Sequence, residues 1–135
     1  TMAICTSMRV EDDVSRVIST FYAELLRIKS IIDQSWAGAP MLVLIDEIYR
    51  GTNSNDRITG ARQTICRLGQ PHILTMVTTH DFELCDLEQE PGVRAVNYHF
   101  EEQYTEDSIC FDYKIKKGRC RTTNAQHLLR LAGIL

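Results

Sequence analysis

Residues 42–47 read Leu-Val-Leu-Ile-Asp-Glu, four apolar residues followed at once by two carboxylates. A β-strand that is buried on both faces has a continuous apolar run of this kind, so we predict a strand over residues 41–46. Residues 73–78, Ile-Leu-Thr-Met-Val-Thr, form a second such run, and His80 follows shortly after it. Ligands of open α/β sheets bind beyond the carboxyl ends of the strands, so we expect the polar residues after both strands to face one crevice.

Patterns typical of helices alternate with these strands. A short strand is predicted over residues 3–10, and apolar residues then recur every three or four positions over 14–32, as in an amphipathic helix. Residues 51–56 are polar and rich in turn formers, and a further helix is predicted over 57–68. This alternation predicts an α/β fold with a mostly parallel sheet flanked by helices.

The last third of the chain follows a different pattern. Residues 93–100 and 108–116 are predicted to form a late antiparallel strand pair, and the second strand alternates apolar and polar residues, which predicts one dry face. A short helix is predicted over 81–87, and a last helix over 124–132 should end at Gly133 in a C-cap. We expect all 135 residues to form one domain.

Composition excludes several classes of function. A net charge of −3 argues against a surface that binds polyanions through bulk positive charge. The five cysteines are scattered and contain no C-x-x-C pair, so we expect buried thiols in a reducing cytoplasm rather than a disulfide framework or a zinc site. Every apolar run is far shorter than the roughly 20 residues of a membrane-spanning helix, so no membrane partner is expected, and no secretory leader is legible.

The polar residues after the two strands suit the chemistry of a nucleotide phosphate. Asp46 is placed to hold Mg²⁺, usually through water, because that hard ion prefers oxygen ligands near the phosphates. Glu47 could polarise the attacking water as a general base, and His80 on the neighbouring strand could stabilise the γ-phosphate. The alternative is structural: many strands end in surface acids, and a lone histidine at a strand end is more often structural than functional.

Several segments, in the same order along the chain, resemble those of the MutS family of DNA mismatch-repair ATPases, which have the ABC-type P-loop NTPase fold. Residues 42–56 and 79–84 resemble the Walker B, D-loop and switch-histidine segments of that family. Ser-Thr-Phe at 19–21 resembles its signature-like motif, Asn-Tyr-His at 97–99 its Asn-x-His segment, and Leu-Ala-Gly at 131–133 its C-terminal motif. The resemblance therefore covers nearly the whole chain.

The resemblance implies a role for each matching residue. Asp46 would serve Mg²⁺, Glu47 the hydrolytic water, and His80 the γ-phosphate of ATP. Ser19 would reach across a dimer interface to the partner's nucleotide, since a helix N-terminus favours an anion. His99 would lie near the adenine.

The same resemblance implies partners and a coupling loop. Residues 52–56, which include the candidate nucleotide-binding residues Asn53 and Asp56, would cross between the subunits of a homodimer and couple its two ATP sites. DNA would be bound by domains outside this chain. The implied cofactors are ATP and Mg²⁺, and the implied compartment is the cytoplasm.

The chain also departs from the family pattern. No G-x-x-x-x-G-K-[ST] phosphate-binding motif occurs, so residues 1–135 resemble only the C-terminal half of the ATPase domain, and we predict that this chain alone does not bind ATP tightly or hydrolyse it. Tyr49 and Arg57 stand where the family usually has glycine. So does Val17, whose β-branched side chain resists the positive φ that glycine permits. These changes indicate a divergent MutS-like branch.

Two classes of function remain open. In the first, the chain is part of the ATP-binding and hydrolysing domain of a MutS-like DNA-binding repair protein and couples ATP turnover to DNA clamping. In the second, it is a catalytically inert dimerisation or interaction module derived from an ABC-type ATPase. Replacement of Glu47 in the whole protein distinguishes the two, because only the first requires that carboxylate.

Overall fold

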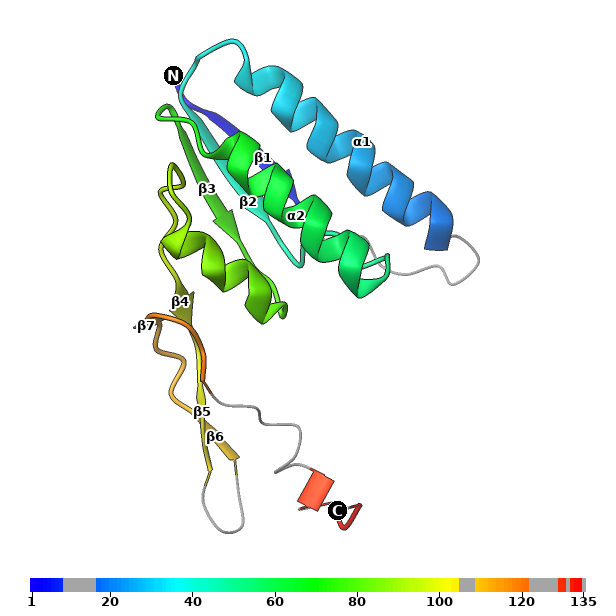
Figure 1. Cartoon of the computed structure of the whole chain (residues 1–135), viewed down its shortest axis with the longest axis vertical. Coiled ribbons are helices and arrows are strands. Elements are labelled where there is room, and N and C mark those ends of the chain that lie inside the picture. Colours follow the sequence, from blue (N-terminus) through cyan, green and yellow to red (C-terminus); the bar gives the residue numbers. More distant parts are fainter. Residues whose placement is uncertain (9–16, 105–108, 122–128, 131, 135) are drawn as a thin grey trace. The chain divides into compact units, whose positions relative to one another are not determined.

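The computed structural model describes residues 1–8, 17–104, 109–121, 129–130 and 132–134. The chain divides into two compact units, Thr1–Ala95 and Val96–Leu135, and each is described by itself (Figure 1).

The first unit is built on a three-stranded sheet in the order β1-β2-β3, with both pairs parallel. Its strands are β1 (Ala3–Ser7), β2 (Met41–Ile45) and β3 (Ile73–Val77). The central strand is the most buried, and Met41, Val43 and Ile45 are at most 3% exposed. The prediction of a parallel sheet is therefore confirmed.

Helices α1 (Val17–Ser35) and α2 (Ser54–Leu68) lie on one face of this sheet, as Figure 1 shows. Each helix connects one parallel strand to the next, and both connections step across the sheet in the same direction. Because crossovers between parallel strands are right-handed, both helices are placed on the same face. The buried residues of the helices join those of the strands in one hydrophobic core. They are Ile28 and Ile31 from α1, and Ala61 and Leu68 from α2.

The start of α2 differs from the prediction. The helix begins at Ser54 rather than at residue 57, because Asn53 acts as its N-cap and accepts a 3.0 Å hydrogen bond from the N–H of Asp56. The predicted short helix over 81–87 is a 3-10 helix, η2 (Phe82–Gln89), which packs against α2.

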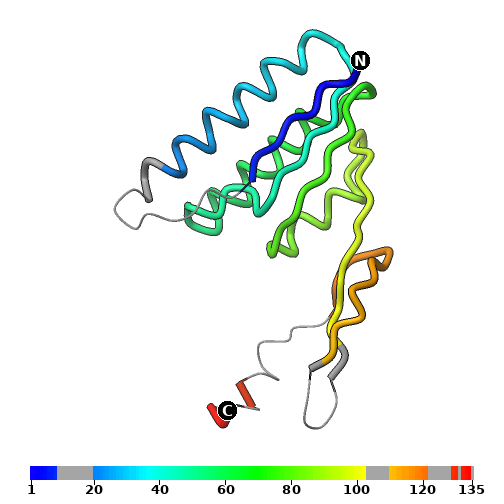
Figure 2. Tube along the Cα trace, turned by 180° about the vertical axis from the view of Figure 1, so that it is seen from behind, coloured from blue at the N-terminus to red at the C-terminus, as the bar shows by residue number. Residues whose placement is uncertain are grey.

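In the described part of the first unit, the other face of the sheet carries exposed apolar side chains. Ile4, Leu74 and Met76 share this face in the strand register, and they are 65%, 64% and 58% exposed. Figure 2, seen from behind, shows the three strands in front of α2. Three aliphatic side chains are thus in contact with solvent on an otherwise well-packed sheet.

The described residues of the second unit form two short antiparallel pairs where one longer pair was predicted. Strand β4 (Tyr98–His99) pairs with β7 (Lys116–Lys117), and β5 (Glu102–Tyr104) pairs with β6 (Ile109–Phe111). The predicted strands over 93–100 and 108–116 are therefore much shorter than expected.

The predicted dry face of the second strand is wrong. Phe111, Tyr113 and Ile115 are 53%, 83% and 60% exposed. The strand breaks after Phe111, and Tyr113 adopts a φ of 53°, which turns the backbone out of the extended conformation. Within the described part of this unit, two-stranded ribbons have no second layer against which an apolar face could be buried.

The C-cap at Gly133 is confirmed. Gly133 has a φ of 70°, its N–H donates to the carbonyl of Arg130, and the N–H of Ile134 donates to the carbonyl of Leu129. The rest of the helix predicted over 124–132 lies largely outside the described residues. Within the described ranges, no helix is long and apolar enough to cross a membrane.

Candidate functional site

The carboxyl ends of β2 and β3 lie side by side. Ile45 pairs with Val77, and the N–H of Thr78 donates to the carbonyl of Ile45 over 3.0 Å. The hydroxyl of Thr78 donates to Oδ1 of Asp46 at 2.6 Å and accepts the N–H of Glu47 at 2.9 Å. One threonine directly after β3 therefore fixes both acidic residues that follow β2.

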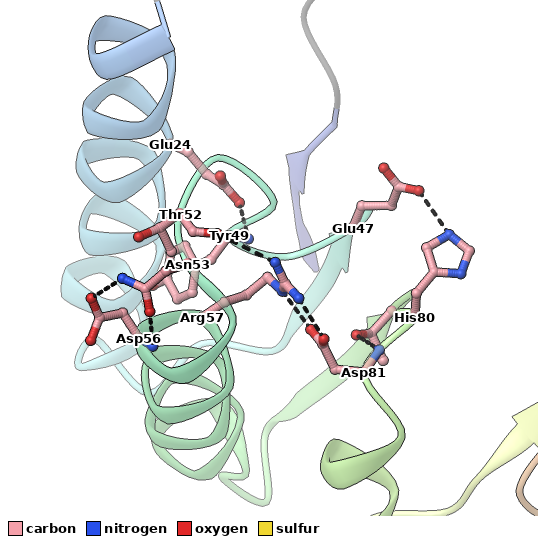
Figure 3. Close-up of polar contacts among 10 residues, drawn as sticks. Glu24, Glu47, Tyr49, Thr52, Asn53, Asp56, Arg57, His80 and Asp81 are labelled. Atoms are coloured by element: carbon pink, nitrogen blue, oxygen red, sulfur yellow. Dashed lines mark hydrogen bonds and ion pairs between the residues drawn. The ribbon is translucent and has the colours of Figure 1, made fainter.

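Glu47 and His80 are in direct contact. Nε2 of His80 lies 3.0 Å from Oε1 of Glu47, and Figure 3 shows the two side chains pointing toward one another. Nη1 of Arg50 donates to the other carboxylate oxygen, Oε2, at 2.6 Å. The expected convergence of the polar residues after the two strands is confirmed, while their chemical roles stay predictions.

The environment of Glu47 favours its charged form. The hydrogen bond from Arg50, followed by that of His80, lowers the pKa of Glu47 below its usual value. Its backbone has a φ of 51°, in the left-handed region that costs a non-glycine residue about 1–3 kcal/mol. The hydrogen bond from the N–H of Glu47 to Thr78 helps to hold this conformation.

Asp46 offers a partial ligand set for a hard cation. Its side chain is exposed, and one carboxylate oxygen is bonded to the Thr78 hydroxyl. Among the described residues, no three histidine, cysteine or acidic side chains gather as a metal site. Asp46 and Thr78 supply only oxygen donors, which suits a magnesium ion that keeps several waters.

The candidate residues in the loop before α2 bond to each other. Oδ1 of Asn53 accepts the N–H of Asp56 at 3.0 Å, and its Nδ2 donates to Oδ2 of Asp56 at 2.5 Å (Figure 3). Both residues are exposed. In this structure they cap a helix, and their predicted role toward a nucleotide stays a prediction.

The remaining two candidates are Ser19 and His99. Ser19 is the third residue of α1 as described, and its side chain falls outside the described residues. His99 belongs to the second unit, where Nδ1 lies 2.8 Å from the carbonyl oxygen of Gly118 and Nε2 lies 3.4 Å from Oε2 of Glu101. Their roles stay predictions.

A buried aromatic residue supports the loop after β2, and sequence reasoning missed it. Tyr49 is 6% exposed, its ring meets Phe21 edge-on with centroids 6.1 Å apart, and its hydroxyl lies 2.9 Å from Oγ1 of Thr64. Its N–H donates to Oε1 of Glu24 at 2.7 Å. The only signal in the sequence was an aromatic residue where related sequences usually have glycine.

An ion pair joins α2 to the residue after His80. Nε and Nη2 of Arg57 donate to Oδ2 and Oδ1 of Asp81, both at 2.7 Å (Figure 3). The pairing lowers the pKa of Asp81 and raises that of Arg57. The two residues are 24 positions apart, so no periodicity in the sequence predicts the contact.

The fold and this site define a class of protein: an α/β protein with a parallel sheet, in which two adjacent acids follow one strand and the second of them contacts a histidine that follows the neighbouring strand. Comparison with known families narrows the class. The family described as MutS domain V matches residues 1–134, and the chain belongs to this family. The resemblance seen in the motifs is thereby confirmed.

Curated relatives agree with this assignment. The chain is 31% identical over 134 residues to a "DNA mismatch repair protein MutS" of Aquifex pyrophilus, and the match covers 98% of this chain and 15% of that protein. It is 35% identical over 135 residues to the protein of the same name in Protochlamydia amoebophila, with 97% of this chain and 15% of that protein covered. The chain thus spans about 15% of the length of these relatives.

Proposed function

We propose that this chain is part of the ATP-binding and hydrolysing domain of a MutS-like DNA repair protein, and that it couples ATP turnover to DNA clamping. The observation that carries the proposal is the 3.0 Å contact between Glu47 and His80, beside the bond between Thr78 and Asp46, at the carboxyl ends of two adjacent parallel strands. This is the edge of an α/β sheet at which phosphate ligands bind. Membership of the MutS domain V family supports it.

Asp46 and Thr78 are the residues that would hold Mg²⁺ at this edge. The fit rests on chemistry, since both side chains offer oxygen atoms and one carboxylate oxygen of Asp46 already accepts the hydroxyl of Thr78. When bound, Mg²⁺ would neutralise charge on the β- and γ-phosphates. Thr78 would then orient the carboxylate of Asp46 as well as the backbone of Glu47.

Glu47 would orient the water that attacks the γ-phosphate. Its lowered pKa keeps it a carboxylate at neutral pH, so it can accept a hydrogen bond from that water. Arg50 occupies one of its oxygens and His80 faces the other, which limits the direction from which the carboxylate can act. His80, with 89% of its side chain exposed, is free to contact the phosphate.

The proposed site also needs residues other than those that follow β2 and β3. Ser19, Asn53, Asp56 and His99 would contact nucleotide within a homodimer of the whole protein. A glycine-rich phosphate-binding loop does not occur in this sequence, and we propose that another part of the whole protein supplies it. DNA would likewise be bound by other domains.

A second candidate function is an interaction module without catalysis. The face of the sheet that carries exposed apolar side chains favours it, since Ile4, Leu74 and Met76 offer an apolar surface of the kind that binds proteins. In that case the acidic pair after β2 would be structural.

Replacement of Glu47 by glutamine in the whole protein tests the proposal. The amide keeps the size of the side chain and loses the charge, so we expect ATP turnover to fall by about 10²–10⁴-fold with nucleotide binding retained. Asp33→Asn is a matched control, since Asp33 is an exposed acid on α1 that pairs with Lys29. Unchanged turnover in Glu47→Gln would overturn the catalytic role and favour the interaction module.

A further inference from the structure

Arg57 makes a contact that a glycine at this position could not make. It is the fourth residue of α2, and its guanidinium forms a bidentate pair with Asp81 through two 2.7 Å bonds. The side chains are only 22% and 13% exposed, so the pair is partly shielded from water. The planar guanidinium fork fixes the orientation of the carboxylate as well as its distance.

The same guanidinium also reaches the loop before α2. Nη1 of Arg57 donates to the carbonyl of Thr52 at 3.3 Å, while the main-chain N–H of Arg57 donates to the carbonyl of Asn53 at 3.0 Å. One residue therefore contacts both the loop over residues 51–53 and Asp81. A displacement of that loop would be transmitted through the guanidinium to Asp81.

Asp81 in turn fixes the backbone around His80. Its N–H donates to Oγ1 of Thr79 at 3.0 Å, and its carbonyl accepts the N–H of Leu84 at the start of η2. Because 89% of the His80 side chain is exposed, packing does little to hold the imidazole. Its place beside Glu47 therefore depends on the backbone over residues 79–81.

We propose that Arg57 is a positioning residue for His80: by clamping Asp81 and the carbonyl of Thr52, it sets the imidazole against Glu47 and links the position of the loop over 51–53 to that of His80. The proposal deepens the proposed function and rests on it for the effect on ATP turnover. The clamp itself rests on the contacts of Arg57 alone.

A second ion pair on the same helix gives a matched control. Nη2 of Arg62 lies 2.5 Å from Oε2 of Glu90, so this pair joins α2 to the far end of η2. It resembles the pair of Arg57 in chemistry and in the elements that it connects. The acid of this pair, Glu90, lies far beyond residues 79–81, whereas the acid bound by Arg57 is Asp81, the residue next to His80. Loss of the Arg62 pair should therefore leave residues 79–81 in place.

The clamp is tested by hydrogen exchange in the 135-residue chain. In Arg57→Gln we expect the N–H of Asp81 to exchange at least about 10-fold faster, while amides of the central strand β2 stay protected and report that the chain is folded. Arg57→Lys keeps the charge without the fork, so it should restore protection only in part. Equal protection of Asp81 in Arg57→Gln and Arg62→Gln would overturn the proposal.

The consequence for turnover is tested in the whole protein by steady-state kinetics. We expect Arg57→Gln to lower kcat for ATP hydrolysis about 10-fold with little change in KM, since His80 is misplaced while nucleotide binding is retained. Asp81→Asn should have a similar effect, and the double variant should be no worse than either single variant. An unchanged kcat in Arg57→Gln, in a protein that Glu47→Gln inactivates, would show a merely structural ion pair and overturn the positioning role.

The two experiments separate the two ideas. If Glu47→Gln leaves turnover unchanged, the proposed function fails, and the exchange measurement still decides whether Arg57 clamps Asp81. If Glu47→Gln abolishes turnover and Arg57→Gln alters neither exchange nor kcat, only the positioning role fails.

Discussion

The N–H of Tyr49 donates a 2.7 Å hydrogen bond to the carboxylate of Glu24, which ties the loop after β2 to helix α1. Tyr49 has a φ of 56°, the left-handed conformation for which glycine is the usual residue. The cost of this backbone, about 1–3 kcal/mol, is offset by the buried ring and its contact with Phe21. At this position, side-chain packing takes the place of the conformational freedom of glycine.

Replacement of Tyr49 by glycine should therefore destabilise the chain, although it relieves the backbone. Loss of a large buried side chain costs about 3–5 kcal/mol, and relief of the left-handed backbone returns part of it, so we expect a net loss of about 2 kcal/mol in the free energy of unfolding. Tyr49→Phe keeps the ring and leaves Thr64 without its partner, at a cost of about 1 kcal/mol. Denaturant unfolding measures both, and a Tyr49→Gly chain as stable as the parent would contradict this account.

Glu24 should make stability depend on pH in the direction opposite to most acids. Burial raises its pKa above the usual value, so the folded chain holds the proton of Glu24 more tightly than the unfolded chain does. The contribution of Glu24 to stability is then greatest below its unfolded pKa of about 4.5 and declines as pH rises through its folded pKa. Stability measured from pH 4 to pH 8 should fall more in the parent chain than in Glu24→Gln.

Comparison of Glu24→Gln with Glu24→Ala tests the hydrogen bond from the N–H of Tyr49 to Glu24. Glu24→Gln retains an oxygen for the N–H of Tyr49, whereas Glu24→Ala leaves that donor without its acceptor, at a cost of about 1–3 kcal/mol. We expect Glu24→Gln to be more stable than Glu24→Ala at pH 7. Equal stabilities would show that the hydrogen bond contributes nothing.

Gly60 provides a test of how rigidly the Tyr49 ring is held. A Cβ at Gly60 would lie 3.2 Å and 3.3 Å from Cε2 and Cδ2 of Tyr49, and the ring is held by Phe21 and Thr64. Alanine in a helix interior is usually favoured over glycine by about 1 kcal/mol, but here we expect Gly60→Ala to lower stability. In a Tyr49→Gly background the same change should stabilise the chain, and a double-mutant cycle measures the coupling.

The face of the sheet that carries Leu74 and Met76 should bind apolar probes. In the 135-residue chain we expect an apolar dye such as ANS to fluoresce, and Leu74→Lys combined with Met76→Lys to reduce that signal several-fold, because both side chains lie exposed on this face. Thr59→Lys, at an exposed position of α2, is the control for added charge. A signal that responds equally to both sets of changes would place the dye elsewhere.

Much of the fold followed from local patterns. The runs over 41–46 and 73–78 predicted two neighbouring parallel strands to within a residue. The second run was also expected to be buried on both faces, and this was wrong, because β3 is an edge strand of the described sheet and exposes Leu74 and Met76. The alternation of apolar and polar residues over 108–116 led to a wrong prediction of one long strand with a dry face. The backbone at Tyr113 leaves the extended conformation, and the alternation of residue types does not reveal such a break. A late antiparallel pairing was still predicted correctly.

The site was predicted in part for the same reason. Parallel strands end at one edge, so the acids after β2 and the histidine after β3 had to lie near one another, and Glu47 and His80 do so at 3.0 Å. The hydrogen bonds from Arg50 to Glu47 and from Thr78 to Asp46 were not predicted, because the sequence does not show which side chains these two residues meet. Their importance follows only from where their hydrogen bonds go.

The sequence by itself determined the strands, the family and the residues at the strand ends, because each depends on neighbours in the chain. Only the tertiary structure decided which distant side chains support them. Glu24 and Tyr49 are 25 residues apart and Arg57 and Asp81 are 24 apart, and each pair joins a helix to the segment that follows a strand. Hydrogen bonds over such separations depend on the packing of whole elements, which no local periodicity encodes.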